Sequence, residues 1–154
     1  MTSRRPPGLG TLLRHLVDLL DQDVAEAYRA AGLNYRPRYT PVLRAVLELD
    51  DASIRAIAGH AQLTHSAASQ TVAQMVRAGL VRIRAGKDAR ERVARLSPRA
   101  VAMLPQLRRV WDATRTAQGR FEAELAYPLS ELLQEAIAAL GREPFRHRYS
   151  RRTQ

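Results

Sequence analysis

The segment from Ser53 to Leu96 changes from helical to strand periodicity, and this change constrains the fold more than any other feature of the sequence. Ser53 and Thr64 each stand before apolar residues at helical spacing, so we expect both to be N-caps of short helices. Gly79 is expected to end the second helix. Two short helices joined by a tight connection predict a helix-turn-helix.

A hairpin is predicted directly after these helices. Residues 80–84, Leu-Val-Arg-Ile-Arg, alternate apolar and basic side chains, which is the pattern of a half-buried strand. Residues 85–88 are a predicted turn, and residues 92–96 are a predicted return strand. Ala94 and Leu96 are expected on one face of it, and Val93 and Arg95 on the other. A basic hairpin in this place is a wing.

Longer helices are predicted on both sides of this segment. A helix from about residue 11 has a wide apolar face and ends at Gly32. Thr40 and Pro41 are expected to be the N-cap and first residue of a helix that stops at Asp50-Asp51.

After the wing, Ser97-Pro98 is expected to begin a helix. Pro105 lies within that pattern and must kink the helix or open a second one. A final helix is predicted after Pro128 and ends at Gly141.

The charge of the chain is concentrated in three places. The net charge is +10, of which residues 64–100 carry +6, while residues 15–63 and 101–141 carry −2 and −1. The remainder lies in the two ends, which include Arg4, Arg5 and the arginines between residues 142 and 152. Because the excess coincides with the helix-turn-helix and wing, it points to a polyanionic partner.

Several classes of protein are excluded or disfavoured. The chain has no Cys, which excludes disulfides, thiolate chemistry and a cysteine redox switch. No apolar stretch reaches membrane-spanning length and no signal-peptide pattern follows the first residues, so we expect a cytoplasmic protein that binds no membrane. No catalytic motif is present, and we expect neither an enzyme nor a cofactor. The four histidines, His15, His60, His65 and His147, lack metal-ligand spacing, so no metal site is expected.

The sequence resembles the MarR family of winged helix-turn-helix transcription regulators over roughly residues 10–141. Leu63-Thr64, Ser69, Val72 and Gly79-Leu80-Val81 are similar to the family's recognition helix and first wing strand. Asp88-Ala89-Arg90 followed by Leu96-Ser97 is similar to its wing signature. Gln70, Ala94, Ser97 and Ala100 depart from the residues usual in the family, and Gln70 would favour adenine over guanine.

The resemblance implies a mainly α fold with a small β-hairpin wing, in which a winged helix-turn-helix is flanked by N- and C-terminal dimerisation helices. The corresponding division of the chain is a basic flexible tail at 1–10, a dimerisation helix at 11–32, the DNA-binding domain at 40–97, dimerisation helices at 98–141 and a basic tail at 142–154.

Contacts to double-stranded DNA are expected from two elements. The recognition helix would place its first turns in the major groove, and small side chains there allow close approach. The wing tip, with Arg90 held by Asp88, would enter the minor groove. The expected DNA-binding residues are Thr64, His65, Ser66, Ala67, Ser69, Gln70, Gln74, Arg82, Arg84, Lys87, Asp88, Arg90 and Arg92, with Arg95 as a further phosphate contact.

The family resemblance further implies a repressor that binds a pseudo-palindromic operator as a homodimer and is released by a small aromatic or anionic ligand. Candidates for the ligand pocket by position are Tyr28, Tyr35, Arg36, Tyr39 and Trp111. Each of these side chains could equally belong to the core or to an interface.

Two other functions remain open at this point. The chain could be an architectural nucleic-acid-binding protein that uses the winged fold without operator specificity. It could also use the fold for protein interaction, although the +6 of residues 64–100 is unlike most protein interfaces.

Overall fold

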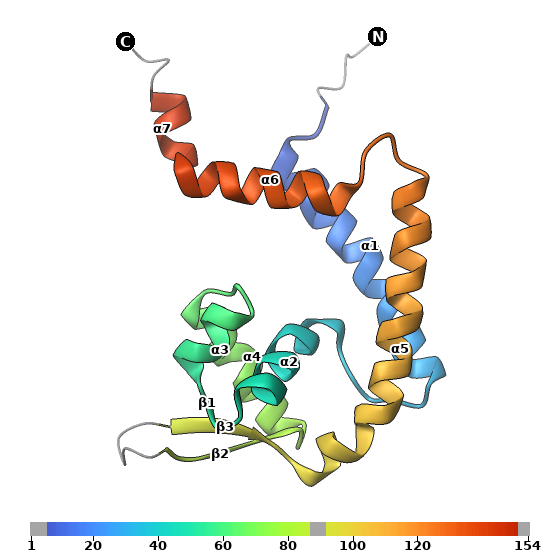
Figure 1. The fold of residues 1–154 in the computed structure, drawn as a ribbon, viewed down its shortest axis with the longest axis vertical. Coiled ribbons are helices and arrows are strands. Elements are labelled where there is room, and N and C mark those ends of the chain that lie inside the picture. Colours follow the sequence, from blue (N-terminus) through green and yellow to red (C-terminus); the bar gives the residue numbers. More distant parts are fainter. Residues whose placement is uncertain (1–5, 87–91, 151–154) are drawn as a thin grey trace. The chain divides into compact units, whose positions relative to one another are not determined.

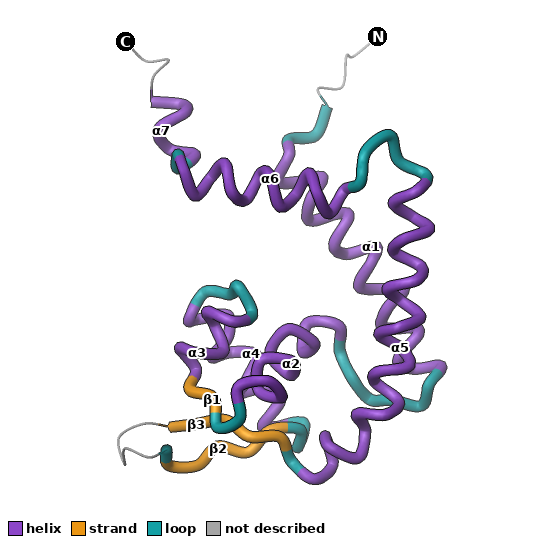
Figure 2. Tube along the Cα trace, in the orientation of Figure 1, coloured by secondary structure: helices purple, strands orange, loops and turns teal. Residues whose placement is uncertain are grey.

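The computed structural model describes residues 6–86 and 92–150 (Figure 1). The chain divides into two compact units, residues 1–110 and 111–154, which are considered separately. Most described residues are helical, and the strands are confined to one small sheet (Figure 2). No helix in the described ranges has the length and apolar character needed to cross a membrane.

The first unit contains the sheet and the helices that pack on it. Its elements are α1 (Leu9–Ala30), the 3-10 turn η1 (Pro37–Tyr39), α2 (Thr40–Leu49), β1 (Ala52–Ser53), α3 (Ile54–His60), α4 (His65–Arg77), β2 (Val81–Ala85), β3 (Arg92–Leu96) and the first half of α5 (Pro98–Ala123). The order confirms the predicted winged helix-turn-helix.

The sheet is antiparallel, with strand order β1-β3-β2. Val81 pairs with Leu96 and Ala85 with Arg92, which is the predicted hairpin. The sequence did not predict β1, in which Ala52 pairs with Ala94 on the other edge of β3. A two-residue strand is too short to produce an alternating pattern. Figure 1 shows α2, α3 and α4 on one side of this sheet.

Two of the predicted helix caps of the helix-turn-helix are confirmed. Ser53 Oγ accepts a hydrogen bond from the Ala56 amide at 3.2 Å, and Thr64 Oγ1 accepts one from the Ala67 amide at 3.1 Å. These bonds satisfy backbone donors that have no partner within the first helical turn.

The prediction for Thr40 is wrong. The N-cap of α2 is Tyr39, and Thr40 is the first residue of the helix. Pro41 is therefore the second helical residue and not the first. The Thr40 hydroxyl instead lies 3.1 Å from the Tyr28 hydroxyl. This tertiary hydrogen bond joins the end of α1 to the start of α2. It uses the Thr40 hydroxyl, which would otherwise be available to cap the helix.

Three helices end in the same way. A residue with left-handed backbone conformation follows the helix, and the amide of the next residue donates a hydrogen bond to a carbonyl in the last helical turn. Gly32 and Gly79 have φ of 71° and 69° and end α1 and α4, as predicted. Gln62 takes this place after α3, with φ of 54°. The Leu63 amide donates to the Ala58 carbonyl at 2.9 Å there, which is the Schellman arrangement that usually favours glycine.

The core of the first unit lies between the helices and the inner face of the sheet. Val42, Leu43, Ile57 and Met75 are fully buried or nearly so, and Ala94 of β3 is buried beneath them. Burial of side chains of this size is the main favourable contribution to folding. The core therefore fixes α4 on the sheet, with one helix face left for other contacts.

Pro105 lies inside α5, which runs without a break from Pro98 to Ala123, so no second helix opens at this proline. The second unit continues with α6 (Leu129–Arg142) and α7 (Phe145–Ser150). Glu122 accepts hydrogen bonds from the Ser130 amide at 2.9 Å and the Ser130 hydroxyl at 3.0 Å. This carboxylate therefore caps α6 from a distance. The helix α7 lies in the segment where only a basic tail was expected.

Candidate nucleic-acid interface

The recognition helix α4 has one buried face and one free face. Ala68, Val72 and Met75 are buried, at the i, i+4 and i+7 spacing of a single helical stripe. Ser66, Ser69, Gln70, Ala73 and Arg77 are exposed. Apart from Val76, which is 39% exposed, small and polar side chains therefore cover the free face, so a partner can approach the backbone closely.

The predicted base-contacting residues divide into two groups. His65, Ser66, Ser69 and Gln70 are exposed on the first turns of α4, as a major-groove contact requires. Thr64 is exposed, and its hydroxyl is used as the N-cap.

Ala67 and Gln74 were expected to be exposed, but both are partly buried. The Gln74 carbonyl oxygen Oε1 is buried and has no hydrogen-bond partner among the described residues. Gln74 follows Gln70 by four residues, so it lies on the same side of α4, one turn further along the helix. Its side chain is therefore turned toward the protein in this structure.

Arginines occupy the outer face of the hairpin. Arg82 and Arg84 are two residues apart on β2, so their side chains share a face, and Arg82 pairs with Arg95 of β3 in the strand register. All three are exposed. Like charges directly opposite each other in a sheet repel, so this arrangement needs compensation.

Asp51 supplies that compensation. Its carboxylate accepts from Arg84 Nε at 3.0 Å and also from Arg84 Nη2. It accepts from Arg95 Nε at 2.8 Å and Arg95 Nη2 at 2.9 Å. The hydrogen bonds from Arg84, with a smaller contribution from Arg95, hold the pKa of Asp51 below its usual range. Sequence reasoning missed this residue because it read Asp50-Asp51 only as a helix stop.

The wing tip lies outside the described residues. Lys87, Asp88 and Arg90, which the sequence assigns to the minor-groove contact, all fall in the segment 87–91. Arg92 is the first described residue after it and is exposed at the start of β3.

Arg99 is a further cation at this surface that the sequence did not single out. Its Nη1 donates to the Ala78 carbonyl at 3.4 Å, beyond the end of α4. A cation at this end complements the negative end of the helix dipole. In the sequence Arg99 is a basic residue two positions after Ser97. It lies beyond the alternating strand pattern, so it was not counted with the arginines of the hairpin.

The aromatic ligand candidates of the first unit form a packed cluster. The rings of Tyr28 and Tyr35 meet edge to face at 4.8 Å between centroids, and those of Tyr35 and Tyr39 at 5.7 Å. All three are buried, and burial raises the pKa of Tyr35 well above its usual value. In this structure the three rings fill the core. Arg36 is exposed and Trp111 is partly buried, in the other unit.

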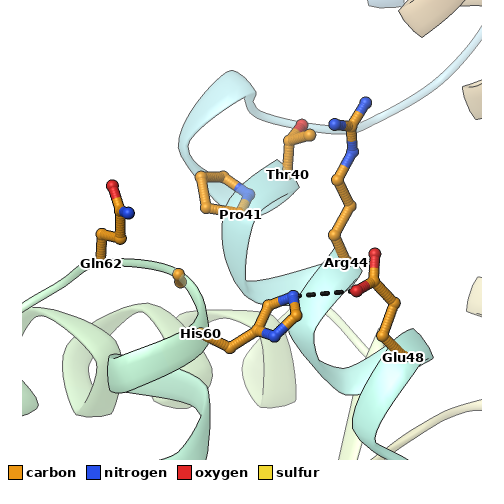
Figure 3. Close-up of a pocket in the computed structure, with 7 residues that line it drawn as sticks. Thr40, Pro41, Arg44, Glu48, His60 and Gln62 are labelled. Atoms are coloured by element: carbon orange, nitrogen blue, oxygen red, sulfur yellow. Dashed lines mark ion pairs between the residues drawn. The ribbon is translucent and has the colours of Figure 1, made fainter. Parts of the chain in front are cut away.

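A shallow pocket of about 340 Å³ lies on the outside of α2 and α3 (Figure 3). His60 Nε2 and Glu48 Oε2 are 3.0 Å apart at its wall, and Arg44 extends over it from α2. None of the predicted ligand residues lines this pocket. Among the described residues no group of three His, Asp or Glu is arranged to hold a metal ion.

Comparison with known proteins identifies this arrangement. Residues 31–91 match the sequence model of the MarR family. The transcriptional regulator MosR of M. tuberculosis, solved in complex with DNA, is 25% identical, with a TM-score of 0.66 over 88% of this chain and 95% of that one. The comparison with curated protein sequences gives no match.

A second solved structure shares the fold. The transcriptional regulator PcaV of Streptomyces coelicolor, solved in complex with its natural ligand, is 21% identical, with a TM-score of 0.58 over 91% of this chain and 99% of that one. Residues 31–91 therefore form a winged helix-turn-helix segment that matches the MarR family of transcription regulators, and the fold along most of the chain is like that of these two solved regulators.

Proposed function

We propose that the chain represses transcription by binding a pseudo-palindromic operator as a homodimer. The observation that carries this proposal is the pairing of two surfaces in one compact unit. The free face of α4 is small and polar, and the adjoining hairpin carries Arg82, Arg84 and Arg95 on its outer face. The first suits the major groove, and on the second Arg82 is available to a phosphate. MosR, which shares the fold at 25% identity, was solved in complex with DNA.

Base reading is assigned to the first turns of α4. Gln70 can pair with both adenine edge groups in the major groove, and Ser66 and Ser69 can hydrogen-bond either base type. None of the exposed side chains in these turns is an Arg, so the guanine contact that is most common elsewhere is absent here. We therefore expect operator half-sites in which adenine is read opposite Gln70.

The minor-groove contact is assigned to Arg90, with Asp88 holding it and Lys87 nearby on phosphates. These residues belong to the undescribed segment, and the assignment rests on the family's wing signature in the sequence. Arg90→Ala is expected to weaken operator binding by about 1–3 kcal/mol. Unchanged affinity would remove the wing tip from the mechanism.

Dimerisation is assigned to the helices outside the winged segment because they expose apolar side chains. On α1 these include Leu9, Leu12 and Val17, with exposed fractions of 70%, 51% and 54%. On α6 no residue is buried, and Ile137 is 63% exposed. Monomeric soluble proteins rarely leave contiguous apolar surface of this kind uncovered. A two-fold dimer would present two copies of α4 to the two half-sites of a palindrome.

Release by a small aromatic or anionic effector completes the proposal. It is supported by the family and by PcaV, which was solved with its natural ligand. The three buried tyrosines would have to separate to admit a ligand, so Arg36 and Trp111 are the more accessible candidates. A panel of aromatic acids that leaves both thermal stability and operator affinity unchanged would count against this part alone.

The experiment that tests the whole proposal is selection of duplexes from a random pool by the purified protein. The proposal expects a palindromic sequence that retains tight binding at about 150–200 mM salt, where purely electrostatic binding has largely decayed. Enrichment of no sequence, with binding lost at that salt, would favour the architectural alternative. Footprinting on the DNA upstream of the protein's own gene would then identify a natural operator.

A further inference from the structure

Not all of the arginines on the outer face of the hairpin are available to a partner, because some of them form ion pairs within the protein. Arg84 and Arg95 both direct their guanidinium groups to the carboxylate of Asp51, and each contributes two of its nitrogens. Arg82, on the same face, takes part in no ion pair within the described residues. Two of the three arginines of this face are thus held by one acid, and one is not.

Asp51 comes from outside the hairpin. It lies between the end of α2 and β1, 33 residues before Arg84 and 44 before Arg95. It therefore links the helical part of the domain to both long strands of the sheet. Two guanidinium groups on one carboxylate fix the direction of β2 and β3 at the base of the wing more firmly than either pair alone.

The backbone at this place is shaped to present the carboxylate. Asp50 and Asp51 both have positive φ, 39° and 53°, in a region that side-chain-bearing residues seldom adopt. Asp and Asn tolerate it better than other residues. β1 begins directly after this turn and pairs Ala52 with Ala94. The turn is thus fixed on both sides, and Asp51 faces the arginines while Asp50 is 83% exposed.

Ion pairing at the base of the wing also reduces the number of guanidinium groups that are available to DNA phosphates. A guanidinium held by a carboxylate can bind a phosphate only if it leaves its partner or shares it. Each additional phosphate that a protein neutralises steepens the dependence of log K on log salt by about 0.9 for duplex DNA. This gain is independent of sequence, so two free arginines would favour all duplexes alike.

We propose that Asp51 is a positioning residue of the DNA interface, which holds Arg84 and Arg95 at the base of the wing and withholds them from phosphates of non-specific DNA. It orients the wing for the operator while it lowers affinity for every other sequence. The inference rests on the proposed function, because it requires that the chain binds duplex DNA.

The test compares Asp51→Asn with Asp50→Asn. Asn keeps the size of Asp and tolerates positive φ, so both variants retain the turn. Both remove one negative charge at adjacent positions, but within the part of the chain that the structure describes Asp50 forms one ion pair, at 3.4 Å from Arg95 Nη2. Binding is measured for a duplex selected by the wild type from a random pool and for a scrambled duplex of the same composition, from 50 to 300 mM salt.

For Asp51→Asn we expect a salt dependence on scrambled duplex that is steeper by about 2–4 in the log–log slope, because up to two arginines are freed in each of the two protomers of the dimer. The ratio of operator affinity to scrambled affinity should fall. Asp50→Asn should leave slope and ratio near the wild-type values. Equal effects of the two variants would show that only net charge matters and would overturn the inference.

A second pair of variants keeps the inference testable if Asp51→Asn is unstable. Arg84→Gln alone should leave the scrambled-duplex slope unchanged, because Asp51 already holds this arginine. In the Asp51→Asn background, the same change should reduce the slope by about 1.8, which is about 0.9 for each protomer of the dimer. A slope reduction of the same size in both backgrounds would overturn the inference. If the wild type binds no duplex even at 50 mM salt, the proposed function fails, and this inference fails with it.

Discussion

Ser97 Oγ donates a hydrogen bond of 2.7 Å to the Gly79 carbonyl, and this bond ties the end of the recognition helix to the start of α5. The same hydroxyl accepts from the Ala100 amide at 3.1 Å, which makes Ser97 the N-cap of α5. One buried hydroxyl thus serves both helices. Ser97 also lies at the open end of the hairpin, where its backbone amide donates a hydrogen bond to the Leu80 carbonyl at 2.9 Å.

Replacement of Ser97 by Ala should lower the free energy of unfolding by about 1–2 kcal/mol. The change removes an N-cap and leaves the Gly79 carbonyl without its donor. Ser97→Thr keeps the hydroxyl and is the control. Urea unfolding followed by circular dichroism measures both variants, and equal losses for Ala and Thr would show that the hydroxyl is not what matters.

Gln70→Ala should weaken binding to the selected operator by about 1–3 kcal/mol and leave scrambled-duplex binding as it is. The side chain is exposed on α4 and carries no charge, so it contributes through base edges and releases no counterions. Fluorescence anisotropy with both duplexes tests this. A parallel loss on operator and scrambled duplex would contradict a base-reading role.

Arg82→Ala and Arg84→Ala should differ, although both remove one charge from the same strand face. Arg82 has no ion pair within the described residues and is available to a phosphate, whereas Asp51 holds Arg84. We expect Arg82→Ala to reduce the salt dependence of binding by about 1.8 in the log–log slope, which is about 0.9 for each protomer of the dimer, and Arg84→Ala to leave it close to wild type. Identical slopes for the two variants would contradict this division of the wing.

Ile137→Lys should shift the protein from dimer to monomer. Ile137 is 63% exposed on α6, so the change costs little in the folded chain but places a charge in the proposed interface. Glu135→Gln, at an exposed position on the opposite side of α6, changes the net charge by the same amount and is the control. Sedimentation equilibrium reports the mass. A wild type that is already monomeric at micromolar concentration would rule out the proposed dimer.

Glu122→Gln should destabilise the protein at neutral pH and much less in acid. The hydrogen bonds from Ser130 lower the pKa of Glu122 from its ordinary value of 4.5. A lowered pKa stabilises the fold above the ordinary value, and that stability is lost as the pH falls through the folded-state pKa. The difference in unfolding free energy between wild type and variant should therefore be full at pH 7 and shrink below pH 4.5. A difference that is the same at pH 7 and pH 3 would contradict the role of the charged carboxylate.

The local features of this fold could be predicted because each is encoded within a few residues. Thr64 stands directly before its helix, and the alternation after Gly79 is visible in five consecutive residues. Both caps and the hairpin follow from such neighbours. Contacts between distant segments could not be predicted in this way. The bond from Thr40 to Tyr28 overrides a local capping signal.

The site could be predicted only as far as its residue types allow. The sequence placed Arg84 and Arg95 on a wing and treated both as phosphate contacts. Their common partner, Asp51, is brought to them by the pairing of β1 with β3, which leaves no periodic signal. Similarly, the sequence left open whether Tyr28, Tyr35 and Tyr39 are ligand residues or core residues, and their edge-to-face packing is visible only in the structure.

The pairing of Ala52 with Ala94 also sets the order in which the domain can form. The helix pair α3 and α4 makes local contacts and can assemble early, whereas the sheet closes only when β3 has joined a strand that precedes both helices. During synthesis the recognition helix can therefore form before the sheet that supports it, because the sheet closes only after residues 92–96 have left the ribosome. A nascent chain released before residue 92 would contain the recognition helix but would lack the strand that completes the sheet and positions this helix.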